Sequence, residues 1–205
     1  MPKVVDHELR RTTIARAALQ VIAERGLVAT TMREVAEAAS CSTGMVNHYF
    51  SDKDALLLAA AKLAVDDLIE GFLSPPSTSP PGPAVLRDQL LSTLPDSAAV
   101  RPSHKVVVHL YASALHSPEL AEHVRVLYGV VIGEIAATLS RGQTEGWVRG
   151  EIDPSITAQL LVSAIDGLGI QTLVDVDGTS PAALAECVDQ LIHVYVLTEV
   201  TRAPN

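Results

Sequence analysis

Hydrophobic residues recur every three to four positions along most of this chain, which is the period of an amphipathic α-helix. The pattern predicts nine helices, at about 9–25, 32–39, 43–49, 52–72, 84–94, 102–115, 118–141, 154–174 and 181–199. The last four carry proline near the first turn, where its missing N–H is tolerated. No segment of useful length alternates as a strand does. The chain is therefore predicted to be all-α.

Local signals indicate where the first helices begin and end. Gly26 is a candidate left-handed residue that ends the first helix. Thr31 and Glu34 form a candidate capping box, in which each side chain accepts a hydrogen bond from the other residue's free backbone N–H. Ser42 or the residue after it can cap the third helix, and residues 51–54 resemble a cap for the fourth. Short polar turns therefore separate the first four helices.

The segment SPPSTSPPGP, residues 74–83, interrupts the helical pattern. Five prolines in ten residues exclude a regular helix, so we expect an extended linker or a long loop there. The chain has 205 residues, which is the length of one ordinary domain or of two small ones.

The charge of the chain is unevenly distributed. The net charge is −9, yet residues 1–55 hold seven basic and seven acidic groups, so the remainder carries the whole excess. Such an asymmetry between two parts of a chain is a hint that one end binds a polyanion.

Several classes of protein are disfavoured. Two cysteines make no disulfide framework, the N-terminus has no apolar signal-peptide core, and no apolar run reaches the ~18 residues of a bilayer span, so we expect a cytoplasmic protein. We find no nucleophile–base constellation and no phosphate loop, so neither an enzyme nor a cofactor is expected. The histidines at 109, 116 and 123 would lie ~10 Å apart along one helix. They cannot share a zinc ion, and no metal site is expected.

The two short helices around the turn at residues 40–42 have the form of a helix-turn-helix. In such a unit the first helix braces the second, which presents small and polar side chains to base edges in the major groove. Asn47 offers a hydrogen-bond donor and an acceptor to adenine, and Met45 can contact a thymine methyl. Gly44 allows the helix backbone to approach the DNA closely. Thr43 can hydrogen-bond a base or a phosphate. A purely structural Tyr49 in the core, or a solvated His48 without a role, remains an alternative.

The stretch TTMREVAEAASCSTGMVNHYFSDKDALL, Thr30 to Leu57, resembles the tetracycline-repressor (TetR) family of bacterial regulators. The resemblance implies a homodimer of all-α subunits, each with a helix-turn-helix DNA-binding domain at residues 1–55 and a ligand-binding and dimerisation domain at residues 56–205. It places near bases the residues Arg33, Thr43, Gly44, Met45, Asn47 and His48. It places Thr31, Tyr49 and Lys53 on phosphates, and Val46 and Phe50 in the core. Two residues depart from the family's pattern: Cys41 stands where valine is usual, and Asn47 stands where tyrosine is frequent.

The C-terminal part resembles the choline-sensing branch of that family, on the stretches 104–135 and 152–174. Choline would need a cage of aromatic faces, and only four aromatic residues follow residue 73. We therefore expect a small-molecule effector that is largely apolar. His109, Ser113 and Asp166 are the polar residues expected to interrupt the pocket lining, although capped or solvated side chains are the alternative for each.

The last two helices are apolar over a wide arc, which predicts a four-helix bundle with a second copy. The residues of this arc are Leu160, Leu161, Ala164, Ile165, Leu168, Leu184, Leu191, Ile192 and Tyr195. Cys187 is expected to be a core thiol, and a position near its mate in the second copy is the alternative. The leading hypothesis is a repressor released from a palindromic operator by its effector. The alternatives are an activator or a ligand-independent regulator of the same fold and, from other classes, a helical interaction module or a small enzyme.

Overall fold

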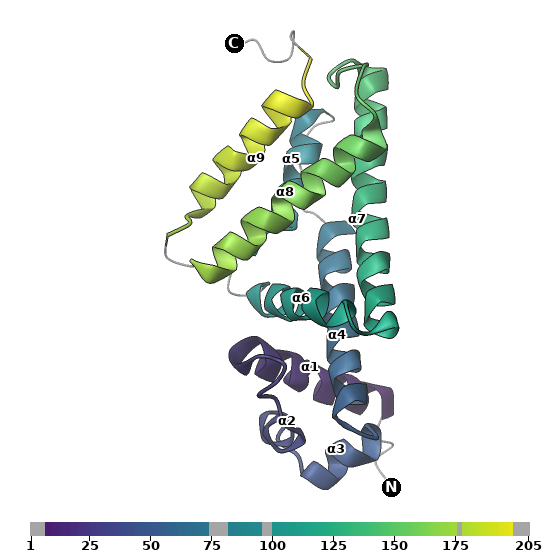
Figure 1. Ribbon diagram of the computed structural model, residues 1–205, viewed down its shortest axis with the longest axis vertical. Helices are drawn as coiled ribbons and strands as arrows, with labels where there is room; N and C mark the ends of the chain where they lie inside the picture. The colour runs from purple at the N-terminus through teal and green to yellow at the C-terminus, as the bar shows by residue number, and fades with distance from the viewer. Residues whose placement is uncertain (1–6, 74–81, 96–99, 176–177, 199–205) are drawn as a thin grey trace, which may run out of the picture. The chain divides into compact units, whose positions relative to one another are not determined.

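The computed structural model describes residues 7–73, 82–95, 100–175 and 178–198, and these ranges contain nine α-helices (Figure 1). The helices are α1 (His7–Arg25), α2 (Met32–Ala38), α3 (Thr43–Tyr49), α4 (Lys53–Leu73), α5 (Pro83–Ser92), α6 (Arg101–Ala114), α7 (Pro118–Glu145), α8 (Pro154–Val174) and α9 (Pro181–Tyr195). Within the same ranges, the only β-type pairing is one isolated bridge between Val148 and Leu197. The predicted all-α class is confirmed.

The expected linker overlaps the start of a helix. Pro83 is the first residue of α5 and follows Gly82, whose φ of 133° suits glycine. Because proline lacks an N–H and has a fixed φ, it is well placed in the first turn. The rest of the expected linker, residues 74–81, lies outside the described residues.

The predicted end of the last helix, at residue 199, is wrong. Helix α9 ends at Tyr195, and the chain then pairs with the segment after α7. The Arg149 N–H donates to the Val196 carbonyl at 3.0 Å, and the Thr198 N–H donates to the Trp147 carbonyl at 3.2 Å. These bonds to a distant segment replace the last helical turn, and no local signal marks them.

The chain forms two compact units. The first comprises residues 1–68 and 97–124, with α1, α2, α3, most of α4 and α6. Helix α1 packs against α2 and α6, and α2 packs against α3. The Asp67 carboxylate of α4 accepts hydrogen bonds from the two terminal guanidinium nitrogens of Arg16, at 2.7 and 3.0 Å. It also accepts one from the Ser103 hydroxyl at 3.3 Å. One carboxylate therefore links α1, α4 and α6.

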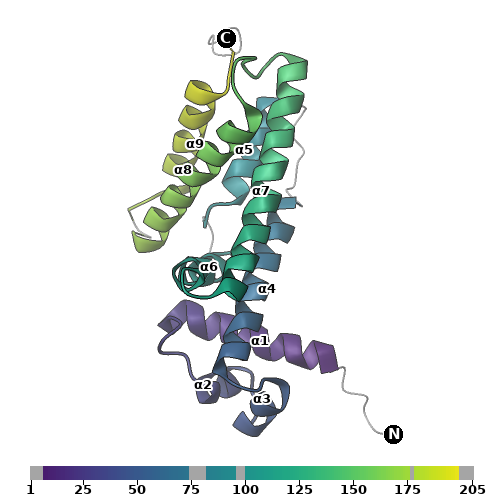
Figure 2. The ribbon, with the colours of Figure 1, turned by 45° about the vertical axis from the view of Figure 1, so that its right-hand side comes forward.

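The second unit comprises residues 69–96 and 125–205, with α5, most of α7, α8 and α9. Its core includes Leu86 and Leu90 of α5, Ile135 and Leu139 of α7, and Val188 of α9, all fully buried. Helices α8 and α9 lie side by side in both views (Figure 2). The expected boundary between domains at residues 55 and 56 stays a prediction.

Helices α7 and α8 are each long and apolar enough to cross a membrane by length and composition, although no unbroken apolar run reaches ~18 residues. Two such helices are weak evidence, because core helices of soluble proteins pass the same test.

Candidate nucleic-acid interface

Helix α3 is anchored by two residues one turn apart. Val46 and Phe50 are 0% and 1% exposed, so the predicted core positions are confirmed. Ser42 precedes the helix in an extended conformation, and its hydroxyl accepts the Met45 N–H at 3.1 Å. Ser40, with φ of 50°, turns the chain between α2 and α3. The sequence thus builds a short helix with one face buried and its start satisfied.

The other faces of α3 are exposed. Thr43, Gly44, Met45, Asn47 and His48 are all exposed. Because residues four apart lie above one another on a helix, Thr43 and Asn47 form one outward row, and Gly44 and His48 form the next. This seven-residue helix therefore presents mostly small and polar groups around a narrow apolar base.

Helix α2 begins with the predicted capping box. The Thr31 hydroxyl accepts the Glu34 N–H at 3.3 Å, and Glu34 Oε2 accepts the Thr31 N–H at 3.0 Å. The Thr31 hydroxyl also donates to Glu34 Oε2 at 2.9 Å. This hydroxyl bond is the largest cause that lowers the pKa of Glu34, and the Thr31 N–H and the Arg25 guanidinium act in the same direction. The Thr31 hydroxyl is therefore committed to its own helix in the free protein.

Two further basic residues lie near these helices. Arg33 is exposed in α2 and makes no ion pair among the described residues. Lys53 Nζ donates to the Val28 carbonyl at 3.1 Å, which ties the start of α4 to the loop before α2. A lysine ammonium has three donors, so two remain for a phosphate. The Asp52 carboxylate accepts the Ala55 N–H at 2.8 Å, which is the main cause that lowers the pKa of Asp52.

A contact that the sequence did not predict joins the start of α1 to the end of α3. The His7 ring lies 5.7 Å from the Tyr49 ring and 6.2 Å from the His48 ring, centroid to centroid. One turn along α1, the Arg11 guanidinium lies 5.1 Å from the Phe50 ring centroid. The four-residue spacing of His7 and Arg11 is the only sequence signal, and it does not identify the partner helix.

Comparisons with known proteins identify this arrangement. The family profile described as "Bacterial regulatory proteins, tetR family" matches residues 14–60, and the profile "BetI-type transcriptional repressor, C-terminal" matches residues 83–196. The chain belongs to the tetR family of bacterial regulatory proteins. It is a transcriptional regulator of the BetI type rather than an enzyme, since its relatives and structural neighbours are regulators.

Relatives match this tetR-family chain over nearly its whole length. The transcriptional regulator BetI of Burkholderia mallei is 32% identical over 176 residues, which cover 83% of this chain and 85% of the relative. A transcriptional regulator from Rhodococcus sp. Rha1 superposes with a TM-score of 0.80 at 26% identity, covering 95% of this chain and 99% of its own. A regulator from Saccharomonospora viridis in complex with choline has a TM-score of 0.81 at 25% identity, covering 94% and 99%.

The three residues expected in the effector pocket of this tetR-family regulator lie in different surroundings. His109 faces Gly26, where an added methyl would lie 3.7 Å from its ring. The Ser113 hydroxyl donates to the His109 carbonyl at 3.0 Å and borders a cavity of about 760 Å³ beside α4 and α6. Asp166 belongs to the second unit, and its Oδ2 accepts the Tyr128 hydroxyl at 2.7 Å. Their effector role stays a prediction.

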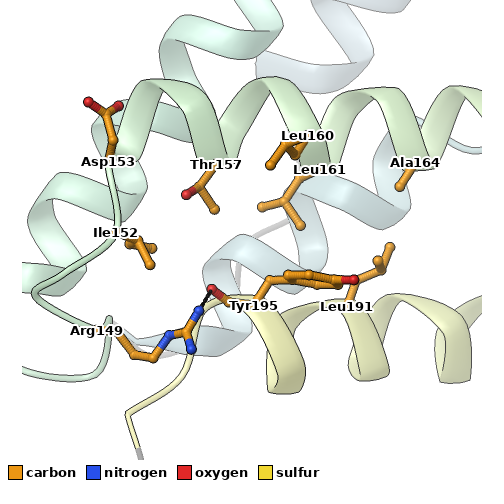
Figure 3. Close-up of a pocket in the computed structure, with 9 residues that line it drawn as sticks. All are labelled: Arg149, Ile152, Asp153, Thr157, Leu160, Leu161, Ala164, Leu191 and Tyr195. Carbon is orange, nitrogen blue, oxygen red and sulfur yellow. Dashed lines mark hydrogen bonds between the residues drawn. The ribbon is translucent and has the colours of Figure 1, made fainter.

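The wide apolar arc of α8 and α9 divides between two surroundings. Leu161, Ile165, Leu184 and Ile192 are buried within the second unit, whereas Leu160 is 61% exposed and Tyr195 is 52% exposed. Leu160, Leu161 and Tyr195 line a cavity of about 410 Å³, and Figure 3 shows Leu161 pointing from α8 toward the Tyr195 ring. The Arg149 guanidinium donates to the Tyr195 carbonyl at 2.7 Å at one end of it.

Cys187 corrects a prediction: its side chain is exposed on α9 in the single chain, so it is not a core thiol. It borders another cavity, of about 650 Å³, which shares Ala164, Leu191 and Tyr195 with the cavity of about 410 Å³. Within the described ranges, no three His, Cys, Asp or Glu side chains gather closely enough to hold a metal ion.

Proposed function

We propose that this chain is a homodimeric, cytoplasmic repressor that binds a palindromic operator and is released from it by a small molecule. The observation that carries the proposal is α3, a short helix whose apolar base is buried and whose remaining faces are exposed. A helix of this form fits the major groove, and its side chains reach base edges there. Residues 1–55 would bind DNA, and residues 56–205 would bind the effector and the second copy.

The proposed contacts are of two kinds, to base edges and to phosphates. Base edges would meet Arg33, Thr43, Gly44, Met45, Asn47 and His48, and phosphates would meet Thr31, Tyr49 and Lys53. A phosphate contact by the Thr31 hydroxyl would have to replace its bond to Glu34, whereas Lys53 has two donors to spare. Lys53 therefore provides stronger support for the phosphate contacts than Thr31 does.

The second copy would cover the exposed apolar side of α8 and α9. Six large apolar side chains there are between 43% and 83% exposed, namely Ile156, Leu160, Ile170, Val174, Val194 and Tyr195. Contiguous apolar surface on a soluble protein marks an interaction site. A two-fold dimer uses the same surface twice and would place two α3 helices about one DNA turn apart.

The effector would have an apolar body, and the Asp166–Tyr128 pair favours a cationic head on it. A carboxylate beside an aromatic ring suits a quaternary ammonium, and the related Saccharomonospora viridis protein binds choline in its crystal. Such a ligand releases DNA only if it binds the DNA-free conformation more tightly than the DNA-bound one. An activator with the same contacts is the alternative.

Footprinting of the purified protein on the DNA upstream of its own gene tests the proposal. We expect a protected palindrome whose half-sites lie about 34 Å apart, or a multiple of that spacing. Asn47→Ala should weaken binding by about tenfold or more, because one good base contact contributes about 1–3 kcal/mol. Gln20→Ala is the control, since Gln20 is exposed on α1 and its side chain bonds, among the described residues, to Glu24 of the same helix.

Two outcomes count against the proposal. If the Asn47 and Gln20 variants bind the operator with equal affinity, α3 is not the recognition helix. Adding choline, or a neutral apolar compound of similar size, tests release separately. Release by the neutral compound alone would contradict the cationic head, and release by neither would contradict an effector of this class, while DNA binding stands in both cases.

A further inference from the structure

The first turn of α1 lies against the last turn of α3. The ring of His7 is within reach of two rings, those of His48 and Tyr49, which are themselves 5.2 Å apart and nearly perpendicular at 83°. Aromatic pairs attract each other at centroid distances of about 4.5–7 Å, and all three separations fall within that range. The three rings therefore form one cluster that spans two helices.

A second contact holds the same two helices in register. Arg11 follows His7 by four residues and thus lies on the same face of α1, one turn further along. Its guanidinium lies over the ring of Phe50, which is 1% exposed. Ile14 and Ala15 continue this face into the core, where they are 0% and 3% exposed. The position of the His7 ring is therefore set by a packed helix face, although the ring itself is exposed.

The cluster restrains the side chain that is expected to bind a phosphate. Tyr49 is half-buried and directly follows the exposed residues of α3 that are expected to contact bases. If one face of a half-buried tyrosine ring were unpacked, the side chain would lose rotamer freedom when its hydroxyl binds a phosphate. That entropy loss opposes binding. Because the His7 ring already packs against Tyr49 in the free protein, part of this entropy loss does not have to occur on DNA binding.

We propose that His7 is a positioning residue for operator binding, whose ring holds Tyr49 and His48 in the orientation in which the Tyr49 hydroxyl meets a phosphate. The inference rests on the proposed function, because it needs Tyr49 to contact the operator. His7 acts through its ring surface and not through its nitrogen atoms. The start of α1 thereby supports the DNA-contacting surface of the helix-turn-helix without touching DNA itself.

The test measures the affinity of the full-length protein for the protected operator fragment by fluorescence anisotropy over a range of salt concentrations. His7→Ala should weaken binding by about threefold to tenfold, the fold-change expected for losing aromatic pairs. His7→Phe keeps the ring and should bind within about twofold of the unchanged protein. Leu9→Ala, which shortens an exposed side chain in the same turn of α1, should have no effect.

A double-mutant cycle separates positioning from simple support of the fold. In a Tyr49→Phe background the phosphate-directed hydroxyl is gone, so His7→Ala should then cost about twofold or less. The slope of log affinity against log salt should be the same for His7→Ala and the unchanged protein, because no cation has left a phosphate.

Three results would overturn the inference. His7→Phe binding as weakly as His7→Ala, with a shallower salt slope, would show a direct polar contact to phosphate. Equal costs of His7→Ala in both backgrounds would show that it does not act through Tyr49. No effect of His7→Ala, while Asn47→Ala and Tyr49→Phe both weaken binding, would reject the role of His7 and leave the proposed function intact.

Discussion

Gly44 lies within α3, although glycine destabilises a helix and the free protein has room for a side chain at this position. A Cβ added there would meet only the Ser42 hydroxyl oxygen, at 3.8 Å, which is ordinary van der Waals contact. Gly44 is exposed in α3, and its conformation is not one reserved for glycine. The free protein therefore gives no reason for glycine, whereas a DNA backbone or base edge pressed against α3 would.

Gly44→Ala should act in opposite directions on stability and on DNA binding. The free energy of unfolding should rise by up to about 1 kcal/mol, since alanine favours a helix over glycine by that amount. Operator affinity should fall about tenfold or more, if the helix backbone approaches the DNA closely. Urea denaturation and fluorescence anisotropy measure the two effects.

Gly71→Ala is the matched control for Gly44→Ala. Gly71 is exposed in α4, and a Cβ added there meets nothing within 4 Å. It should give the same gain in stability without a change in operator affinity. If both variants bind the operator as the unchanged protein does, α3 does not approach DNA at Gly44.

On the scale of a single element, α2 depends on its first turn. It has only seven residues, and a helix of that length does not form alone in water. The capping box satisfies free N–H groups at its start, and packing of Val35 and Ala36 in the core holds the rest. The brace of the helix-turn-helix therefore relies on Thr31 and on the ionised Glu34.

Glu34→Gln should reduce the loss of stability in acid. Because folding lowers the pKa of Glu34 below its ordinary value of 4.5, its ionised form stabilises the fold above about pH 4.5, and this contribution disappears as pH falls through the lowered pKa. Glutamine preserves the capping hydrogen bond but does not titrate. Urea unfolding between pH 7 and pH 3.5 measures the effect.

The difference in stability between the unchanged protein and Glu34→Gln should be largest at pH 7 and should shrink on acidification. Asp52 titrates with the same sign in both proteins, so it cancels in this difference. A difference that stays constant from pH 7 to pH 3.5 would show that the charge of Glu34 does not stabilise α2.

At the scale of the whole molecule, several large apolar side chains on α8 are exposed in the part of one chain that the structure describes. Ile156, Leu160 and Val174 are exposed along one helix of 21 residues. Exposed apolar surface contributes about 25 cal/mol per Å² when it is removed from water, so covering these side chains favours association. A regulator that reads a palindrome also needs two copies of α3.

Leu160→Glu should convert the proposed dimer into monomers and lower operator affinity with it. A carboxylate at this position would be buried without a partner in the dimer but solvated in the monomer. Sedimentation velocity at micromolar concentration measures the change, with Leu115→Glu as control. Leu115 is 81% exposed but lies in the first unit, so its replacement should leave the dimer intact. Two equally dimeric variants would show that the copies meet elsewhere.

The resemblance to the tetR family placed the buried base of α3, Val46 and Phe50, in the core. The sequence by itself determined the nine helices and the capping box of α2. These features depend on residues within four positions of one another, so periodicity, caps and glycine signals suffice to predict them. The exposed candidates for DNA contact on α3 follow from the same spacing once Val46 and Phe50 are placed inside.

Only the tertiary structure decided which groups from distant parts of the chain meet. Helices α8 and α9 are apolar over a wide arc, so periodicity could not separate the buried part of this arc from its exposed part. The pairing after α9, the exposed Cys187 and the contact of His7 with Tyr49 each depend on elements packed against one another, for which the local sequence holds no signal. Local hydrogen bonding fixes the helices, whereas burial between them fixes their partners and so the surfaces left for DNA and for a second copy.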